Sequence, residues 1–368
     1  MRLLQLVAGE KWTGAAAVVY DQTAALVAAG VEAQFGFVRD SPLSRRLLPL
    51  GWARPLLSRP RGPLDYVRDV RSLRETLRRE RFDVVHCHLS HDHFLAAAAV
   101  RGTPAVLART FHHSAHVRTD FVSRGLMRRT SGFAFANRAI AAKFGRPGPV
   151  HSPVVDPGRF RPGDAPRELL AKLGVPAGAF VVGTVGKMAA ARGHEEAIAA
   201  AAALPPPVVL LHVGKGELRP QLEARAARLG TGSRNFWAGY EEEGLPDLYR
   251  AMDVFLFPAS GSEQGQRAIL EAMSSGVPVV ALDLPGVPDL LTHEREGLVV
   301  RSAGEIAPAL ARLRESVDDR RRMAAQARER ALEFAPELFA DRVRGFYADL
   351  PARNWSTSRA WDAGETAG

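Results

Sequence analysis

Hydrophobic residues follow two alternating patterns along the chain. Short runs rich in Val, Leu, Ile and Phe recur, and each is followed by a turn and a longer stretch rich in Ala, Leu and Arg. The short runs predict buried strands and the longer stretches predict helices. The expected strands cover residues 3–7, 33–37, 83–86, 105–108, 180–185, 208–213, 254–257 and 278–281. The expected helices cover residues 15–29, 65–80, 195–203, 220–229, 266–275, 305–315 and 320–334.

Strands that alternate with helices of this length predict an α/β fold, because a parallel strand pair needs a crossover connection. The pattern occurs twice, and a Pro/Gly-rich stretch between the halves, residues 146–165, indicates an interdomain linker. We therefore expect two doubly wound, Rossmann-like domains, 1–155 and 156–335, with parallel sheets that face each other across a cleft. Residues 351–368 have no periodicity and are expected to be a disordered tail.

The composition fits a globular protein. Of 368 residues, 46% are apolar and 24% are charged, which excludes wholesale disorder. No apolar run reaches the ~18–20 residues that cross a bilayer, and the opening segment MRLLQLVAGEKW turns polar too early for a secretory signal. The single cysteine, Cys87, excludes an internal disulfide. We expect a cytoplasmic protein.

The net charge of +9 is unevenly distributed. Residues 1–160 hold 24 basic and 12 acidic residues, whereas the remainder holds 25 and 28. A basic half indicates an anionic partner, such as a membrane surface, a phosphorylated ligand or nucleic acid. No nucleic-acid recognition motif appears in the sequence, so we do not expect nucleic acid to be the partner.

The segment 41–62 concentrates this positive charge. It has five arginines, no acidic residue, and Leu and Trp interleaved between them. Such a segment suits an anionic membrane interface, and a mobile loop on the rim of the first domain explains it equally well. Four arginines further along the chain extend the positive character: Arg118, Arg124, Arg128 and Arg129.

Two glutamates in the second half are eight residues apart. Glu263 lies in a Ser/Gly-rich loop after a strand, and Glu271 lies within the helix that follows. The start of that helix, near Gln266, offers free N–H groups to a diphosphate, and a carboxylate can accept hydrogen bonds from vicinal hydroxyls of a sugar. The bare spacing is also typical of ordinary surface glutamates. The following segment, SGVPVVALDLPGVPDLL, favours a binding site because it predicts a strand, a turn and another helix start.

Two further segments could meet a phosphorylated ligand. Lys187 and Arg192 stand between an expected strand and an expected helix, although a basic pair in that position is more often surface charge. Gly214 and Gly216, in HVGKGELRPQL, would let the backbone approach a ligand. A plain strand–helix turn remains the alternative for these glycines.

In this order, these motifs resemble those of the retaining glycosyltransferases of family 4, also called glycosyl transferases group 1, which have the GT-B fold. The resemblance runs from the first strand to about residue 350. It implies that a sugar moves from a nucleotide-diphosphate-sugar co-substrate, UDP- or GDP-linked, to a hydroxyl acceptor. We expect no tightly bound cofactor.

The resemblance assigns roles in the second half of the chain. Glu263 would contact hydroxyls of the donor sugar and Glu271 the ribose, while Lys187 and Arg192 would grip the diphosphate in the reverse of the usual Arg–Lys order. Gly265, Gln266 and Arg267 replace the common GFG after the first glutamate, and Pro285 and Asp289 depart from the downstream pattern. Among these residues, Gly265 and Gln266 are expected to help to bind the donor.

The resemblance also assigns roles to residues in the first half of the chain. KWTGAAAVVYDQTAAL resembles the family's glycine loop, with Gly14 at its second glycine and Thr13 in place of the first, so backbone N–H groups near Gly14 would meet the donor phosphate. VVHCH and RTFHHS also match the family, which places His112 facing the donor. A final helix, 336–350, would cross back to the first domain.

Seven of the eleven histidines lie between residues 86 and 116, which raises a metal site as an alternative. His86, Cys87 and His88 alternate between the two faces of a strand, so they cannot all converge on one ion. No standard metal-binding spacing appears. We therefore expect no metal.

The expected role is a retaining glycosyltransferase of bacterial-type cell-envelope glycan or glycolipid synthesis, with a lipid-linked or saccharide acceptor. It would be cytoplasmic, with a peripheral position at the inner face of the cytoplasmic membrane. Two alternatives remain open: a GT-B sugar-nucleotide epimerase or phosphorylase, and a non-catalytic nucleotide- or glycan-binding protein.

Overall fold

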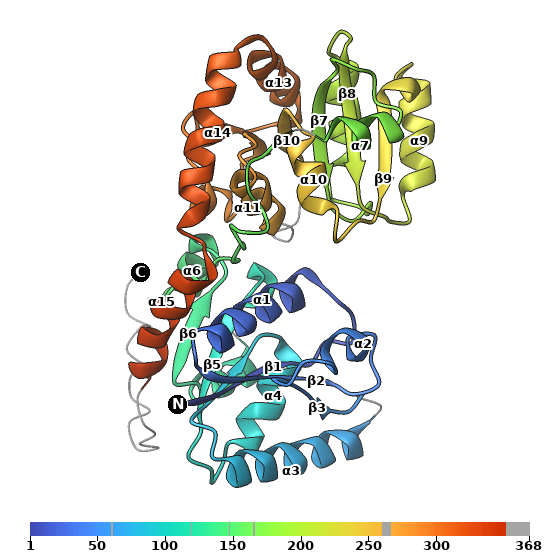
Figure 1. Ribbon diagram of the computed structural model, residues 1–368. Helices are drawn as coiled ribbons and strands as arrows, with labels where there is room; N and C mark the ends of the chain where they lie inside the picture. The colour runs from blue at the N-terminus through green and yellow to red at the C-terminus, as the bar shows by residue number, and fades with distance from the viewer. Residues whose placement is uncertain (60–61, 119, 147, 165, 260–265, 351–368) are drawn as a thin grey trace. The chain divides into compact units, whose positions relative to one another are not determined.

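The chain divides into two compact units in the computed structural model, which describes residues 1–59, 62–118, 120–146, 148–164, 166–259 and 266–350. Unit 1 contains Met1–Ser152 and the residues from Pro336 onward, and unit 2 contains Pro153–Ala335 (Figure 1). The chain passes from the first unit to the second within the Pro/Gly-rich stretch 146–165. The expected tail, 351–368, lies outside the described residues.

Unit 1 is built on a six-stranded, all-parallel sheet in the order β3-β2-β1-β4-β5-β6. Its strands are β1 (Arg2–Val7), β2 (Glu32–Val38), β3 (Ala53–Leu57), β4 (Val84–Cys87), β5 (Val106–Phe111) and β6 (Gly132–Phe135). Its helices are α1 (Gly14–Ala28), α2 (Ser44–Leu47), α3 (Pro63–Glu80), α4 (Ser90–Ala99), α5 (Phe121–Met127), α6 (Arg138–Phe144) and α15 (Pro336–Ala348). The strand order reverses between β1 and β4, which is where doubly wound sheets bind ligands.

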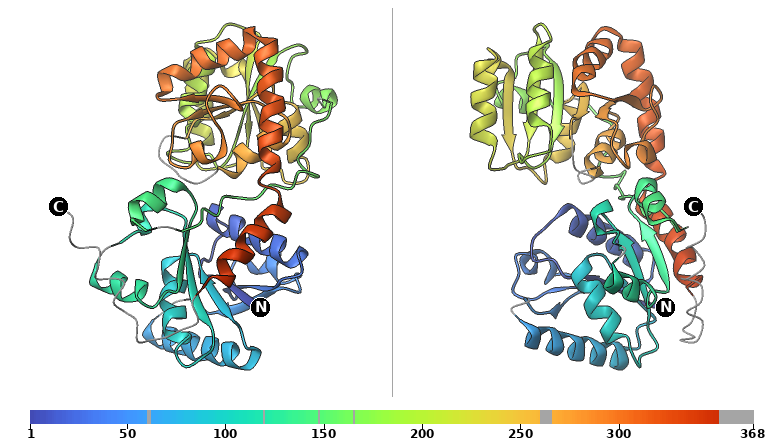
Figure 2. Two further views of the ribbon diagram at one scale, coloured as in Figure 1. Left: turned by 90° about the vertical axis from the view of Figure 1, so that its left-hand side faces the viewer. Right: turned by 180° about the vertical axis from the view of Figure 1, so that it is seen from behind.

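The alternation of side chains along β1 separates the two faces of this sheet. Leu4 and Leu6 pack in a cluster with side chains of α3 and α4. Val7 packs on the opposite face with residues of α1, and Gln5 on that face reaches α15. Figure 2 shows α1 and α15 side by side, and these two helices are in contact. The sheet face that α15 covers therefore includes buried polar side chains, of which Gln5 is one.

Unit 2 repeats the same topology, with the sheet order β12-β11-β10-β7-β8-β9 and all strands parallel. Its strands are β7 (Phe180–Val185), β8 (Val208–Val213), β9 (Asn235–Gly239), β10 (Val254–Phe257), β11 (Val279–Leu282) and β12 (Gly297–Val300). Its helices are α7 (Arg167–Lys172), α8 (His194–Ala202), α9 (Arg219–Arg228), α10 (Leu245–Arg250), α11 (Arg267–Ser274), α12 (Val287–Leu290), α13 (Ile306–Glu315) and α14 (Val317–Leu332). The order reverses between β7 and β10.

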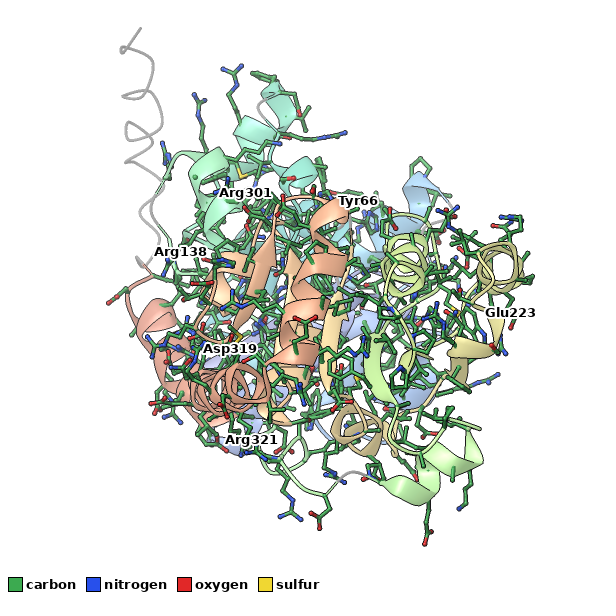
Figure 3. All side chains as sticks on the ribbon, turned by 90° about the horizontal axis from the view of Figure 1, so that it is seen from above. Tyr66, Arg138, Glu223, Arg301, Asp319 and Arg321 are labelled. Atoms are coloured by element: carbon green, nitrogen blue, oxygen red, sulfur yellow. The ribbon has the colours of Figure 1, made fainter. Side chains whose placement is uncertain are left out.

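Helices of unit 2 cover its sheet with apolar stripes. In α14 every fourth residue, Met323, Ala327 and Ala331, is buried, while Arg321 on the same helix is exposed (Figure 3). Two separate apolar clusters form, one on each face of the sheet.

The sequence predicted the fold class correctly: both sheets are parallel and alternate with helices. Each expected strand and helix is present, with ends that differ by a few residues. Four strands were not expected from the hydrophobic pattern: β3, β6, β9 and β12.

The basic segment 41–62 is part of the packed fold, so the expectation of a mobile loop is wrong for its described residues. It forms α2 and the edge strand β3, and Leu43, Leu47 and Leu57 are buried in the core. Trp52 packs on Tyr20 with ring centroids 5.4 Å apart. Most apolar side chains of the segment therefore stabilise unit 1, and Arg45 and Arg46 are among its exposed residues. Across the described ranges, no helix is both long enough and apolar enough to span a bilayer.

Candidate functional site

Three loops of unit 2 leave neighbouring strands at the same edge of the sheet. Because β7 lies between β10 and β8, and all three strands are parallel, the loops after them are adjacent at the point where the strand order reverses. These loops, and the helices that follow them, carry the expected site residues. Lys187 and Arg192 follow β7, Gly214 and Gly216 follow β8, and Gln266 and Glu271 follow β10.

The loops after β7 and β8 are held together by backbone hydrogen bonds. Met188 N–H donates to Lys215 O at 3.1 Å, and Leu218 N–H donates to Met188 O at 3.1 Å. A Cβ on Gly214 would lie 2.0 Å from Gly186 O, and one on Gly216 would lie 2.1 Å from Met188 O. The two glycines therefore allow one loop to pack against the other. Ligand contact by their backbone remains a prediction.

Lys187 projects from this paired loop. Its side chain is 60% exposed, and Nζ lies 3.0 Å from Oε2 of Glu217, which is 61% exposed. A backbone hydrogen bond at Glu217 and the nearby Lys187 lower the pKa of that carboxyl. An exposed ion pair of this kind adds little stability, because water and salt screen it. The ammonium group can therefore exchange Glu217 for a more highly charged anion at little cost.

The rest of the β7 loop is constrained more tightly. Ala191 has φ of 61° and Gly193 has φ of 75°, so two nearly adjacent residues adopt the left-handed conformation. Left-handed backbone at a residue other than glycine is uncommon and is concentrated at functional sites. Gly193 begins α8 in close contact with the end of β10, since a Cβ there would lie 1.8 Å from Pro258 O. The sequence analysis missed Gly193, although a glycine two residues before an expected helix was a signal for it.

Arg192, between these two residues, is half-buried. Burial lowers the pKa of Arg192, but a guanidinium starts so high that it stays charged at neutral pH. The loop therefore presents two cations at the strand switch point, one exposed and one partly enclosed.

Glu271 is buried inside α11, and both of its carboxylate oxygens are hydrogen-bonded. The hydroxyl of Tyr249 donates to Oε2 at 2.9 Å, and Nε of Arg267 donates to Oε1 at 2.8 Å. Burial and the neighbouring Glu271 raise the pKa of Tyr249 well above its usual value. A carboxylate has about four lone-pair sites, so each oxygen retains one. Contact with ribose hydroxyls stays a prediction for these remaining sites.

Gln266 connects the start of α11 to the turn before α12. Its Nε2 donates to Pro285 O at 2.6 Å, and its amide fills the space beside Gly286, whose φ is 94°. The side chain thus fixes the helix start, which leaves donor contact there to the backbone. Glu263 and Gly265 lie outside the described residues, so their expected roles stay predictions.

In unit 1, Gly14 is the first residue of α1, and Thr13 caps that helix. The Thr13 hydroxyl oxygen accepts a hydrogen bond from Ala16 N–H at 3.2 Å. Thr13, which replaces a glycine of the family pattern, therefore satisfies a free donor of the helix end. Gly14 is placed beside the loop after β1, and its contact with phosphate remains a prediction.

Asp92 joins the loops at the switch point of unit 1, and the sequence analysis did not single it out. Its buried carboxylate accepts hydrogen bonds from the backbone N–H groups of Ala8, His88 and Leu89, and from the guanidinium of Arg109. Burial raises the pKa of Asp92 to about 7, against the opposing effect of Arg109 and the backbone donors. The residue holds the ends of β1, β4 and β5 together.

His112 follows β5 and is only partly accessible. Its Nε2 lies 3.0 Å from Nδ1 of His88. Burial, together with the positive charge of Arg109, lowers the pKa of His112 to about 3, so the imidazole is neutral. His112 can therefore act as a hydrogen-bonding group but supplies no positive charge. In the described part of the chain, no three His, Cys, Asp or Glu side chains are arranged to hold a metal ion.

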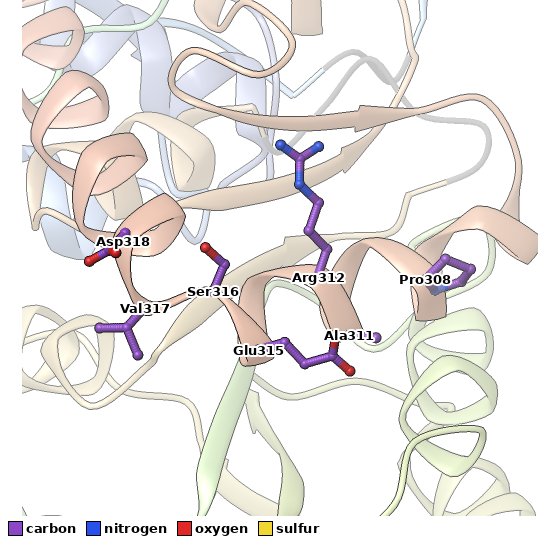
Figure 4. Close-up of a pocket in the computed structure, with 7 residues that line it drawn as sticks. All are labelled: Pro308, Ala311, Arg312, Glu315, Ser316, Val317 and Asp318. Carbon is purple, nitrogen blue, oxygen red and sulfur yellow. The ribbon is translucent and has the colours of Figure 1, made fainter.

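A shallow hollow between α13 and α14 is separate from these loops (Figure 4). It is lined by Pro308, Ala311, Arg312, Glu315, Ser316, Val317 and Asp318. Arg312 is already paired with Glu294 and Asp319. The neighbouring Arg314 donates to the backbone of Pro205 and Pro206, before β8, so the hollow lies near the opposite edge of the sheet from the site loops.

Family models match both halves of the chain. One described as Glycosyltransferase Family 4 matches residues 12–144, and one described as Glycosyl transferases group 1 matches residues 179–316. The first range contains strands β2 to β6, and the second contains all six strands of unit 2. The chain belongs to the family 4, group 1 glycosyltransferases.

The chain is also similar in sequence to characterised glycosyltransferases. The chain is 30% identical over 217 residues to a 2-deoxystreptamine glucosyltransferase of Streptomyces kanamyceticus, covering 55% of this chain and 56% of the relative. It is 29% identical over 254 residues to a GDP-mannose-dependent α-(1-6)-phosphatidylinositol monomannoside mannosyltransferase of Mycobacterium tuberculosis, covering 63% and 66%. The chain thus spans about half to two thirds of the length of these relatives.

The fold has a close counterpart among solved structures. HepE of Anabaena, crystallised with UDP and glucose, superposes with a TM-score of 0.80 at 22% identity, covering 95% of this chain and 100% of HepE. At this identity the likeness shows the fold alone, which is GT-B.

Proposed function

We propose that the protein is a retaining glycosyltransferase that moves a sugar from a nucleotide-diphosphate-sugar to a hydroxyl of an acceptor. The observation that carries this proposal is the edge of unit 2 at the β7/β10 switch point. There Lys187 and Arg192 follow β7, and α11 follows the neighbouring parallel strand β10. Cations and the N-terminus of a helix both favour a bound diphosphate.

The proposed chemistry assigns one task to each group. Lys187 and Arg192 stabilise the charge that develops on the departing diphosphate, and Glu271 binds the ribose. Glu263 and His112 orient the sugar, while Gly14, Gly214, Gly216, Gly265 and Gln266 shape the donor site. Groups that are preorganised around developing charge commonly supply the largest share of catalysis. No covalent nucleophile from the protein is needed.

Nucleotide release from a panel of UDP-, GDP- and ADP-sugars tests the proposal. Release that depends on an acceptor is expected from one donor, and Lys187→Ala or Glu263→Ala should lower the rate by about 100-fold or more, as removal of a transition-state donor does. Lys172→Ala, an exposed lysine on α7, is the matched control and should keep its rate.

Other results would contradict the transferase reaction. Release that requires inorganic phosphate would indicate a phosphorylase, and epimerised donor without release would indicate an epimerase. Nucleotide binding by calorimetry with no turnover of any donor would indicate a binding protein.

The relatives support a narrower choice of substrates. Their names specify a glucosyl donor in one case, and GDP-mannose with a phosphatidylinositol mannoside acceptor in the other. We propose a UDP- or GDP-hexose as donor and a saccharide or lipid-linked acceptor in cell-envelope synthesis. The acceptor can be identified by mass spectrometry of the product once the donor panel has given an active sugar.

A lipid-linked acceptor would bring unit 1 to an anionic membrane surface in the cytoplasm, and α5 supports this part of the proposal. Phe121 and Val122 are 88% and 54% exposed, unusual for large apolar side chains, and Arg124, Arg128 and Arg129 follow closely. Apolar side chains that insert among arginines bind anionic lipid by burial and charge together. Within 41–62, Arg45 and Arg46 can add charge.

Vesicle sedimentation tests this membrane surface. Phe121→Ser is expected to weaken binding to anionic vesicles roughly 10- to 100-fold, because a buried Phe side chain contributes about 1.5–3 kcal/mol. Leu229→Ser, which alters an exposed leucine of unit 2, is the control. Failure of the unaltered protein to bind anionic vesicles at low salt would refute the membrane proposal and leave the transferase proposal intact.

A further inference from the structure

A continuous row of hydrogen-bonded side chains runs through the interior of unit 1, beginning at His112. Its members come from strands β1, β4 and β5, from the residues just after β4 and β5, and from helix α15. In order they are His112, His88, Gln5, Tyr347, His86 and Thr110. All except His112 are buried, so water cannot replace a missing partner.

Five short contacts link these side chains. His112 Nε2 lies 3.0 Å from His88 Nδ1, and His88 Nε2 lies 2.6 Å from Gln5 Oε1. Gln5 Nε2 lies 2.9 Å from the Tyr347 hydroxyl, which lies 2.7 Å from His86 Nδ1. His86 Nε2 lies 2.7 Å from Thr110 Oγ1. Each distance is that of a good hydrogen bond.

The amide of Gln5 gives the row a direction. Its Oε1 can only accept, so His88 must carry its proton on Nε2, which leaves Nδ1 of His88 as an acceptor. The partner of that Nδ1, Nε2 of His112, must then be the donor. On the other side, Gln5 Nε2 donates to Tyr347, whose own proton goes to Nδ1 of His86.

Every bond in the row therefore points the same way. A neutral imidazole has one donor and one acceptor nitrogen, so reversing a bond on one histidine forces the next bond to reverse as well. Burial lowers the pKa of both His86 and His88 well below the usual value, which keeps both rings neutral as this pattern requires. In the structure, the Tyr347 hydroxyl accepts from Nε2 of the Gln5 amide, and this bond leaves Oε1 of the amide facing His88.

We propose that Gln5, His88 and Tyr347 are positioning residues that hold His112 in the tautomer protonated on Nε2. Nδ1 of His112 then has an unshared electron pair, and in the described part of the chain no protein group is hydrogen-bonded to it. This nitrogen can accept a hydrogen bond from a hydroxyl group but cannot donate one to a phosphate oxygen. The identity of that hydroxyl, as one on the transferred sugar, rests on the proposed function.

NMR of protein labelled with ¹⁵N at histidine tests the proposal without any substrate. Long-range proton–nitrogen spectra separate protonated from bare ring nitrogens, and loss of signals in His112→Gln assigns that ring. The unaltered protein is expected to show His112 protonated on Nε2 and bare on Nδ1. A proton on Nδ1, or an even mixture of tautomers, would overturn the proposal.

Two substitutions have opposite expected results. Tyr347→Phe leaves Gln5 Nε2 without its hydrogen-bond partner. The amide can then turn over to donate to His88, and His112 should become a mixture of tautomers. Gln5→Glu should retain Nε2–H on His112 at a pH where the new carboxyl is ionised, because a carboxylate can only accept from His88. Tyr20→Phe, whose hydroxyl lies outside the row, is the control for loss of a tyrosine oxygen in unit 1.

The activity of these variants connects the row to the proposed function. With the active donor, Tyr347→Phe should lower kcat/KM about tenfold, the value of one hydrogen bond, whereas Tyr20→Phe should not. If the His112 tautomer is unchanged in Tyr347→Phe, the hydrogen-bonded row does not determine that tautomer and the proposal is refuted. If Tyr347→Phe does not fold, a change of tautomer in Gln5→Glu refutes it instead. If the unaltered protein shows the expected tautomer but transfers no sugar, the proposed function fails and the assignment of the tautomer stands.

Discussion

Acidification from about pH 7.5 to about pH 5 is expected to unfold unit 1 before unit 2. Five histidines of unit 1 have a pKa lowered mainly by burial: His86, His88, His93, His112 and His151. The values are about 3 for His93 and His112 and about 4 for His151. In unit 2, burial lowers the pKa of two histidines, His194 and His212.

The sign follows from where protons bind. An unfolded histidine takes up a proton below about pH 6.5, whereas these buried rings resist protonation to much lower pH, so stability falls as the pH falls through that range. At about pH 5 each such histidine costs about 2 kcal/mol, and five cost on the order of 10 kcal/mol. Asp92, whose pKa is raised to about 7, acts in the opposite direction but is a single group. The sum approaches the total stability of a domain, about 5–15 kcal/mol.

Hydrogen exchange followed by mass spectrometry can separate the two units. Peptides from β4 and β5 should lose protection at a higher pH than peptides from β8. His93→Gln removes one titrating ring and should move the transition of unit 1 to lower pH. His91→Gln, at a less buried histidine of the same helix, should leave it in place. Earlier loss of protection in unit 2 would contradict the expectation.

Gly193→Ala is expected to destabilise unit 2 by about 3–5 kcal/mol and to abolish donor turnover. A left-handed conformation costs an alanine about 1–2 kcal/mol. The added Cβ would also lie 1.8 Å from Pro258 O, and overpacking against backbone costs about 1–3 kcal/mol more. The loop must move to relieve this contact, and Lys187 and Arg192 move with it.

Gly178 provides a matched control for this substitution. It has the same φ of 75°, in the same unit, but a Cβ there would meet no atom within 4 Å. Gly178→Ala should therefore lower the free energy of unfolding only by the about 1–2 kcal/mol of the left-handed conformation, and it should retain activity. Urea unfolding measures both free energies, and equal losses in the two variants would show that the contact with Pro258 carries no weight.

The sequence predicted the architecture because the buried strands are continuous apolar runs. Three of the four strands that the pattern did not predict have reasons in their sequences. Strand β3 contains Arg54 and Pro55 and lies at the edge of its sheet, where only part of each side chain is covered. Strands β6 and β12 have four residues, of which the first is glycine, so only three side chains remain to form an apolar run.

The sequence predicted only those residues of the candidate site that belong to short contiguous motifs. Lys187, Arg192 and Glu271 belong to compact segments between a strand and a helix, and such segments can be recognised in the sequence. Gln5 and Tyr347 could not be paired in this way, because they are 342 positions apart and each is unremarkable among its neighbours. The same applies to Gly193, because the atom that leaves no room for a Cβ there is the carbonyl oxygen of Pro258, just after β10.

The return of α15 to unit 1 also determines the order in which the protein can be completed during synthesis. Residues 1–152 leave the ribosome first, but Gln5 and His86 have no tyrosine to bond until residue 347 has been made. Unit 2 is a single continuous stretch, 153–335, and all of it is available before α15. Since domains generally fold as units during translation, unit 2 can reach its native state while unit 1 still lacks its last helix. A released chain truncated after residue 335 should therefore contain a folded second half attached to an incomplete first half.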